Sequence, residues 1–127
     1  MSQQNPRTVL VVDDERMTRL YHTVVLTRAG YICLEAADAA EAFSHLRARH
    51  VDLIMLDLFM PKISGQEFIK GFRADPKFMK VPVLVISAEP DGEKLRQEET
   101  ASAGSVEFLQ KPLAPKALLD AVARLLA

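Results

Sequence analysis

Residues 8–15, TVLVVDDE, decide the fold of this chain. Five residues with β-branched or aliphatic side chains lead directly into three consecutive carboxylates. A short apolar run that ends at polar residues predicts a strand buried on both faces of a sheet. Like charges a few ångströms apart repel each other, and a buried carboxylate without a partner is costly. The end of this predicted strand is therefore expected to face something cationic.

Four further apolar runs follow along the chain. They are ICLEA (32–36), VDLIML (51–56), VPVLVIS (81–87) and VEFLQ (106–110). Short buried strands that alternate with helical patterns are typical of a parallel sheet covered by helices on both faces. The sequence therefore predicts an α/β fold with a doubly wound, five-stranded parallel sheet.

Helix signals occupy the connections between these runs. Gly30 is placed to end a first helix, and Asp38 with Glu41 reads as a capping box that opens a second. The apolar residues that recur at helical spacing in the first helix are Met17, Leu20, Tyr21, Val24 and Val25. Within residues 90–104, Leu95 is the only large aliphatic residue, so a fourth helix there is expected to be weakly anchored.

Length and composition limit the classes of protein to consider. The chain has 127 residues, of which 49% are hydrophobic and 26% charged, values typical of one globular core. The net charge is −1 and the basic residues are scattered, so direct nucleic-acid binding is not expected. We find neither a membrane-spanning apolar run nor a signal peptide, and therefore expect a cytoplasmic protein. Cys33 is the single cysteine, which excludes an internal disulfide.

Polar residues gather where the predicted strands end. They are Asp13, Asp14, Glu15, Asp57, Ser87 and Lys111. Each of them alone is more typical of a helix cap, a turn or a solvated surface group. In doubly wound sheets, however, ligands bind beyond the carboxyl ends of the strands, which brings all six to one edge. Together they predict an octahedral Mg²⁺ site built from one or two carboxylates, a backbone carbonyl and waters.

Four segments resemble the motifs of response regulator receiver domains from two-component signalling systems. VVDDE, LDLFMPKISG, ISA and FLQKP are similar to the family's acidic pair, phosphoacceptor segment, switch hydroxyl segment and lysine-proline segment. The resemblance covers nearly the whole chain, in the family's order and spacing. It implies a flavodoxin-like, CheY-like (βα)5 fold with strand order 2-1-3-4-5. Residues 1–7 are then expected to form a tail, and residues 8–127 the receiver domain.

The resemblance also implies a role for each residue of the acidic site. Asp57 would accept a phosphoryl group from a histidine kinase or a histidine phosphotransfer protein and become an aspartyl phosphate. Asp14, Asp57 and the Phe59 backbone carbonyl would bind Mg²⁺ directly, and Asp13 would act through a metal-bound water. Such a protein catalyses its own phosphorylation and dephosphorylation, and is not an enzyme acting on a separate substrate.

Residues around the phosphoryl group are assigned by the same resemblance. Lys111 and Ser87 would contact the phosphoryl oxygens. Phe108 would be the switch aromatic that alters the face of the fourth helix, fifth strand and fifth helix, where a downstream protein or output domain binds. Phe59 is expected to shield the phosphoryl group from water and Glu89 to orient that water, with slow hydrolysis as the result.

Two alternatives use related folds. A haloacid-dehalogenase-type phosphatase also forms an aspartyl phosphate with Mg²⁺, but it needs a second Asp two residues after the nucleophile, where this chain has Phe59. A flavodoxin relative would cradle a phosphate with a hydroxyl-rich and glycine-rich first loop. The loop here reads DDERMT, whose carboxylates would repel that phosphate. The phosphorylated receiver is the favoured interpretation.

Overall fold

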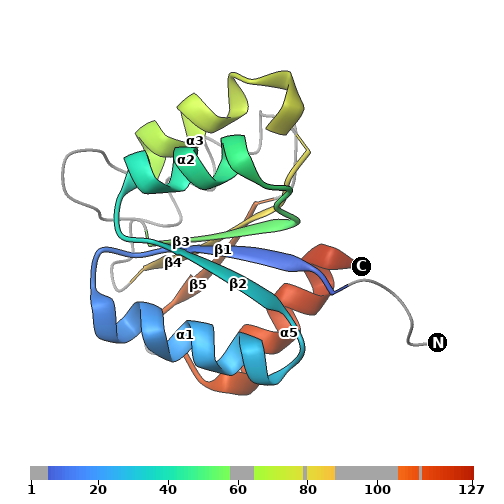
Figure 1. The fold of residues 1–127 in the computed structure, drawn as a ribbon. Coiled ribbons are helices and arrows are strands. Elements are labelled where there is room, and N and C mark those ends of the chain that lie inside the picture. The colour runs from blue at the N-terminus through green and yellow to red at the C-terminus, as the bar shows by residue number, and fades with distance from the viewer. Residues whose placement is uncertain (1–5, 58–64, 79, 88–105, 112) are drawn as a thin grey trace.

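The computed structural model describes residues 6–57, 65–78, 80–87, 106–111 and 113–127. A central sheet lies between α2 and α3 on one face and α1 and α5 on the other (Figure 1). The elements in chain order are β1 (Thr8–Val12), α1 (Arg16–Arg28), β2 (Ile32–Ala36), α2 (Ala39–Ala48), β3 (Leu53–Asp57), α3 (Gly65–Arg73), a 3-10 helix (Pro76–Phe78), β4 (Val83–Ser87), β5 (Val106–Gln110) and α5 (Pro115–Leu126). The weakly anchored fourth helix expected within residues 90–104 lies outside the described residues.

The sheet confirms the predicted fold class and strand order. Its five strands are parallel and run β2-β1-β3-β4-β5. β1 lies between β2 and β3, with Val12 beside Ala36 on one side and Leu56 on the other. The carboxyl ends of these three strands are therefore level, and the residues that follow them meet at one edge.

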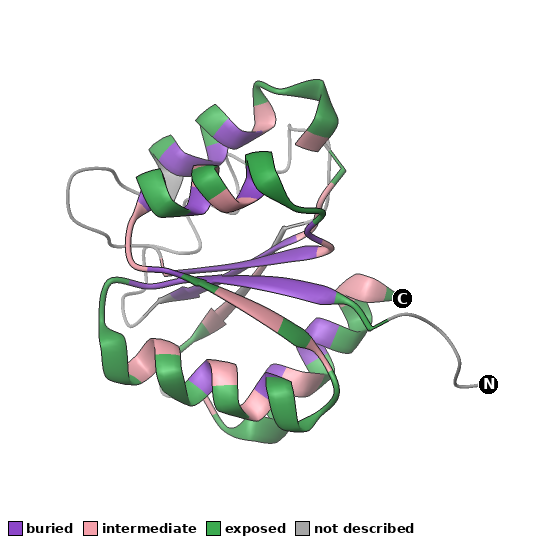
Figure 2. Ribbon diagram, in the orientation of Figure 1, coloured by how far each residue is buried: buried purple, intermediate pink, exposed green. Residues whose placement is uncertain are grey.

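The strands contribute side chains to two hydrophobic cores. Alternate residues of a strand point to opposite faces, so one set packs against α2 and α3 and the other against α1 and α5. Members of the first core include Leu10, Val12, Ile54, Leu56, Phe68 and Phe72, and members of the second include Val9, Val11, Leu53, Met55, Leu84 and Leu118. Figure 2 shows β1 buried along its length, as its unbroken apolar run predicts.

Local capping places α1 and α2 as the sequence predicts. Gly30 has φ 102°, a left-handed conformation that favours glycine, and it follows the end of α1. Asp38 accepts a hydrogen bond from the Glu41 amide at 2.9 Å. The Glu41 carboxylate reaches back to the Ala37 amide at 2.6 Å, which completes the box one residue earlier than the usual partner. The end of β2 is thereby tied to α2.

The apolar stripe of α1 is not its buried face. The residues of this helix that are buried are His22 and Leu26. Of the five residues predicted at helical spacing, Val25 packs against the core shared with α5, whereas Met17, Leu20, Tyr21 and Val24 are exposed by 69%, 43%, 42% and 39%. An exposed apolar stripe on a helix is a feature that needs a partner.

Cys33 packs at the margin of the core shared with α1 and α5. Burial raises the pKa of its thiol, so the side chain behaves as a small hydrophobic group. Among the described residues, no helix has the length and apolarity needed to cross a membrane.

Candidate functional site

The carboxyl ends of β1 and β3 bring three aspartates together. Asp13 and Asp14 follow β1, and Asp57 is the last residue of the neighbouring β3. One carboxylate oxygen from each lies within 4.8 Å of the others. Asp13 is buried, Asp57 is half-buried and Asp14 is exposed. This grouping of oxygen ligands, open to solvent on one side, is the kind that Mg²⁺ binds.

Lys111 is the cation that the described residues bring to this cluster. Its Nζ lies 3.9 Å from Asp13 Oδ2 and 3.8 Å from Asp57 Oδ2. Both distances are longer than a hydrogen bond, so the ammonium group attracts the two carboxylates without binding either closely. One lysine charge faces three carboxylate charges. The site therefore retains an excess of negative charge that a divalent cation would offset.

Glu15 has a different role from the two aspartates before it. Its carboxylate caps α1 by accepting hydrogen bonds from the Thr18 amide, at 2.8 Å, and from the Thr18 hydroxyl. These bonds lower the pKa of Glu15 because they stabilise its charged form. The three consecutive carboxylates are thus two site residues and one helix cap.

The acidic turn is held in place by backbone and side-chain bonds. The Asp13 amide donates to the Ala36 carbonyl at 3.0 Å, which extends the pairing of β1 with β2. The Glu15 amide donates to Asp13 Oδ1 at 2.9 Å. Arg19 Nη1 donates to the Asp13 carbonyl at 2.6 Å, and Arg19 Nε pairs with the Glu35 carboxylate at 3.0 Å. Asp13 is therefore anchored through its amide, its carbonyl and its carboxylate.

Arg19 and His22 are site neighbours that the sequence analysis missed. His22 is 3% exposed and lines a small pocket with Asp13 and Asp57. Burial lowers the pKa of His22, and so does Lys111, whereas Asp13 opposes them. The sequence shows an arginine one turn into the first helix, close to the acidic turn. It does not show that this arginine pairs with Glu35, because Glu35 lies on a different element, β2.

Several predicted site residues are only partly placed. Ser87 is the last residue of β4 and pairs with Gln110, and Phe108 lies in β5 beside Val85. Their strands therefore lead to the edge that carries Asp57, as expected. Phe59 and Glu89 lie outside the described residues.

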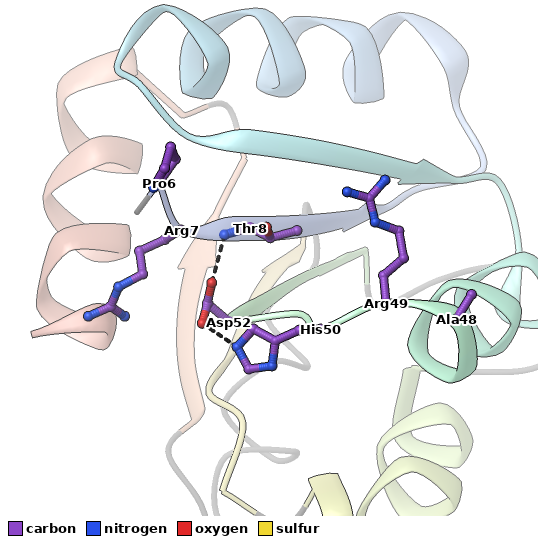
Figure 3. Close-up of a pocket in the computed structure, with 7 residues that line it drawn as sticks. All are labelled: Pro6, Arg7, Thr8, Ala48, Arg49, His50 and Asp52. Atoms are coloured by element: carbon purple, nitrogen blue, oxygen red, sulfur yellow. Dashed lines mark hydrogen bonds and ion pairs between the residues drawn. The ribbon is translucent and has the colours of Figure 1, made fainter. Parts of the chain in front are cut away.

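A larger pocket lies at the opposite end of the sheet, where the strands begin (Figure 3). It is lined by Pro6, Arg7, Thr8, Ala48, Arg49, His50 and Asp52. Asp52 is the acidic residue among those that line this pocket. Both the Thr8 amide and His50 Nε2 lie 2.8 Å from its carboxylate. We therefore place the candidate site at the cluster of aspartates beside Lys111, and not at this larger pocket.

Comparison with known proteins points to one family. The sequence model of the response regulator receiver domain matches residues 9–123. The phosphate regulon transcriptional regulatory protein PhoB of Pseudomonas aeruginosa is 35% identical over 121 residues, which are 95% of this chain and 51% of that protein. The chain thus spans about half the length of this relative.

Solved structures show the same relationship over whole chains. The chemotaxis protein CheY4 of Vibrio cholerae has a TM-score of 0.86 and 33% identity, with 95% of this chain and 99% of that chain covered. A signal receiver domain from Bermanella marisrubri has a TM-score of 0.84 and 30% identity, covering 97% and 100%. These matches do not support the haloacid-dehalogenase-type alternative. The chain belongs to the response regulator receiver domain family.

Proposed function

We propose that Asp57 is the phosphoacceptor of this receiver domain and that Mg²⁺ binds beside it. The observation that carries the proposal is the convergence of three carboxylates with oxygens within 4.8 Å of one another, two of which also lie 3.9 and 3.8 Å from the Lys111 ammonium group. Asp57 and Asp14 would bind the ion directly, and Asp13 through a water. The described donors fit the ion because they are all hard oxygen ligands and carry excess negative charge.

In the proposed reaction a carboxylate oxygen of Asp57 attacks the phosphorus of a phosphohistidine. The new O–P bond forms as the N–P bond breaks, and the histidine nitrogen leaves with its electron pair. Mg²⁺, when bound, would offset the charge on the phosphoryl oxygens. The Lys111 ammonium, 3.8 Å from Asp57, is placed to pair with one of those oxygens, and Ser87 would bond another.

Loss of the phosphoryl group by hydrolysis would return the domain to its resting state. We propose that water attacks the same phosphorus as the P–O bond to Asp57 breaks, which releases inorganic phosphate and restores the Asp57 carboxylate. Glu89 would orient that water, whereas Phe59 would hinder its approach and so keep the hydrolysis slow. Phe108 of β5 would act as the switch aromatic, and phosphorylation would alter the face of the fourth helix, fifth strand and fifth helix for partner binding. Because phosphohistidine donors are charged from ATP, the proposal places the protein in the cytoplasm.

Phosphorylation with a small donor tests the acceptor. Protein incubated with acetyl phosphate and Mg²⁺ should gain one phosphoryl group by intact-mass spectrometry. Asp57→Asn should gain none, because the amide is not a nucleophile. Asp52→Asn is the matched control, since Asp52 also lies at the end of a strand connection but at the opposite edge. Equal incorporation in wild type and Asp57→Asn would refute the assignment.

We further propose that the phosphodonor protein docks on the exposed stripe of α1. Leu20 and Tyr21 lie on the helix that begins directly after the acidic turn, and the Tyr21 hydroxyl donates to the Leu113 carbonyl at 3.2 Å. The stripe therefore continues toward the segment that follows Lys111. A donor protein seated there would bury apolar surface while presenting its phosphohistidine to Asp57.

Two donors separate docking from chemistry. Leu20→Gln should slow phosphotransfer from a cognate phosphohistidine protein by about tenfold, which corresponds to about 1.4 kcal/mol of lost contact energy. Phosphorylation by acetyl phosphate should be unchanged. Ile32→Gln is the matched control, because Ile32 is equally exposed, at 41% against 43%, but starts β2 at the far end of the sheet. If both variants slow transfer equally, the donor does not dock on α1.

A further inference from the structure

We infer that Arg19 is a positioning residue that orients the acidic turn for Mg²⁺ binding without contacting the ion or the phosphoryl group. Its guanidinium group donates to the Asp13 carbonyl at 2.6 Å and pairs with Glu35 at 3.0 Å. The inference rests on the proposed metal site, because the turn that Arg19 holds carries two of the proposed ligands.

The Arg19–Glu35 pair joins three elements. Arg19 is in the second turn of α1, Glu35 is near the end of β2, and Asp13 follows β1. The Glu35 carbonyl is in turn 2.9 Å from His45 Nε2 on α2. The guanidinium suits this position because it is planar and donates in two directions at once, which an ammonium group on the same stem does less well.

The bond to the Asp13 carbonyl acts on two side chains. That carbonyl belongs to the peptide unit that joins Asp13 to Asp14. Because a peptide unit is planar, a bond that fixes the carbonyl also fixes the orientation of the Asp14 amide and the position of the Asp14 Cα. The Asp13 carboxylate is meanwhile held by the Glu15 amide. Without Arg19 the turn could rotate about its remaining anchors, and the carboxylates would spend less time in one arrangement.

Glu35 has a separate part in this arrangement. It holds the guanidinium against the backbone and balances its charge. Arg19 therefore orients the acidic turn without supplying the free positive charge that the carboxylates lack. The Arg19 side chain is only 14% exposed, against 42% for Glu35, so this pair differs from a fully solvated surface pair of small energetic value.

The chain contains a matched pair for comparison. Arg124 on α5 pairs with Glu107 on β5, which is again an arginine on a helix bound to a glutamate on a strand. Among the contacts that the structure describes, this pair makes none with the acidic turn. Arg124→Met therefore removes the same chemistry without affecting Asp13.

The test measures Mg²⁺ affinity by titrating the backbone amide NMR shifts of the intact protein. Arg19→Met should bind Mg²⁺ about tenfold more weakly, as is typical when a residue that orients a ligand is lost. Arg19→Lys, which keeps the charge, should recover part of the affinity. Glu35→Gln should show a smaller loss. Arg124→Met should bind as wild type does.

A second measurement separates positioning from a general structural role. The rate of phosphorylation by acetyl phosphate is followed against Mg²⁺ concentration. Arg19→Met should need more Mg²⁺ for half-maximal rate but reach nearly the wild-type maximum, because Asp57 and Lys111 are intact. A lowered maximum with unchanged Mg²⁺ dependence would overturn the inference.

The outcomes are distinguishable. If wild type binds no Mg²⁺, the proposed metal site itself fails. If wild type binds and a folded Arg19→Met binds equally well, Arg19 has no positioning role. If Arg19→Met does not fold, Arg19→Lys and Glu35→Gln decide, and unchanged affinity in both overturns the inference.

Discussion

The two ends of the sheet treat their carboxylates in opposite ways. At the amino end, Asp52 has close partners, with the Thr8 amide and His50 Nε2 each 2.8 Å from its carboxylate (Figure 3). At the carboxyl end, Lys111 Nζ lies 3.8 Å from Asp57 and 3.9 Å from Asp13, and Asp14 adds a third carboxylate to the same cluster. The contrast is one of charge and not of hydrogen bonding, because Asp13 also accepts a hydrogen bond from the Glu15 amide at 2.9 Å. Three carboxylates at the carboxyl end outnumber the one lysine that the described residues bring to them.

This difference explains why the larger hollow is not the reactive one. The pocket at the amino end is bigger, but its one carboxylate, that of Asp52, already accepts a hydrogen bond from the Thr8 amide (Figure 3). The pocket beside Asp13, Asp57 and His22 is small. Phosphoryl transfer needs charges held at fixed positions more than it needs volume.

The same Asp→Asn substitution should have opposite effects on stability at the two ends of the sheet. Asp52→Asn should destabilise the fold by about 2 kcal/mol, because it weakens hydrogen bonds to a charged acceptor. Asp13→Asn should stabilise the metal-free protein. Two unit charges within 4.8 Å of each other repel by about 3 kcal/mol or more at an effective dielectric constant near 20. Part of that gain is offset by the lost attraction to Lys111.

Urea unfolding in chelator and low salt measures both variants. Opposite signs of the change in unfolding free energy are expected. If Asp13→Asn and Asp52→Asn destabilise the protein equally, the carboxylates at the two ends are both structural.

Addition of Mg²⁺ sharpens the comparison with a smaller effect. At ten times its dissociation constant, a ligand that binds only the folded state adds about 1.4 kcal/mol of stability. The unfolding free energy of wild type should rise by this amount. That of Asp52→Asn should rise by the same amount, although the variant is less stable than wild type without Mg²⁺. Asp57→Asn should gain much less because it lacks a ligand. Differential scanning calorimetry with and without Mg²⁺ measures these gains, and an equal gain in Asp57→Asn would place the ion elsewhere.

The smallest expected effect concerns the pH dependence of stability through His22. Burial lowers its pKa below the ordinary 6.5 in the folded state, with Lys111 acting in the same direction and Asp13 opposing. The unfolded chain then binds the proton more readily. His22 therefore costs no stability above about pH 6.5, and stability falls as the pH drops toward the folded pKa, by at most about 1.4 kcal/mol per pH unit.

His22→Leu removes this contribution while filling a similar space. The difference in unfolding free energy between wild type and His22→Leu should move in favour of the variant as the pH falls from about 7.5 to about 5.5. A difference that is constant with pH would mean that His22 is not held neutral by burial.

Much of the fold could be predicted because its signals are local. Asp38 with Glu41 and Gly30 act within one or two turns of chain, and they place the ends of α1 and α2 as predicted. The apolar runs predicted the strands because a strand buried on both faces has no polar side to show. The outward stripe of α1 could not be predicted, since periodicity identifies a helix but not the element against which it packs.

The sequence by itself determined the parallel sheet, its family and the aspartates that meet at one edge. The sheet follows from the alternation of apolar runs with helical patterns, and the family follows from the order and spacing of the motifs. The aspartates meet because parallel strands all end at the same edge of the sheet. Only the tertiary structure decided that Glu15 is a cap, that Arg19 reaches back to Asp13, and that His22 is buried beneath the site. Each of these depends on which atoms come within about 3 Å of one another, a distance set by packing between elements that are far apart in the chain.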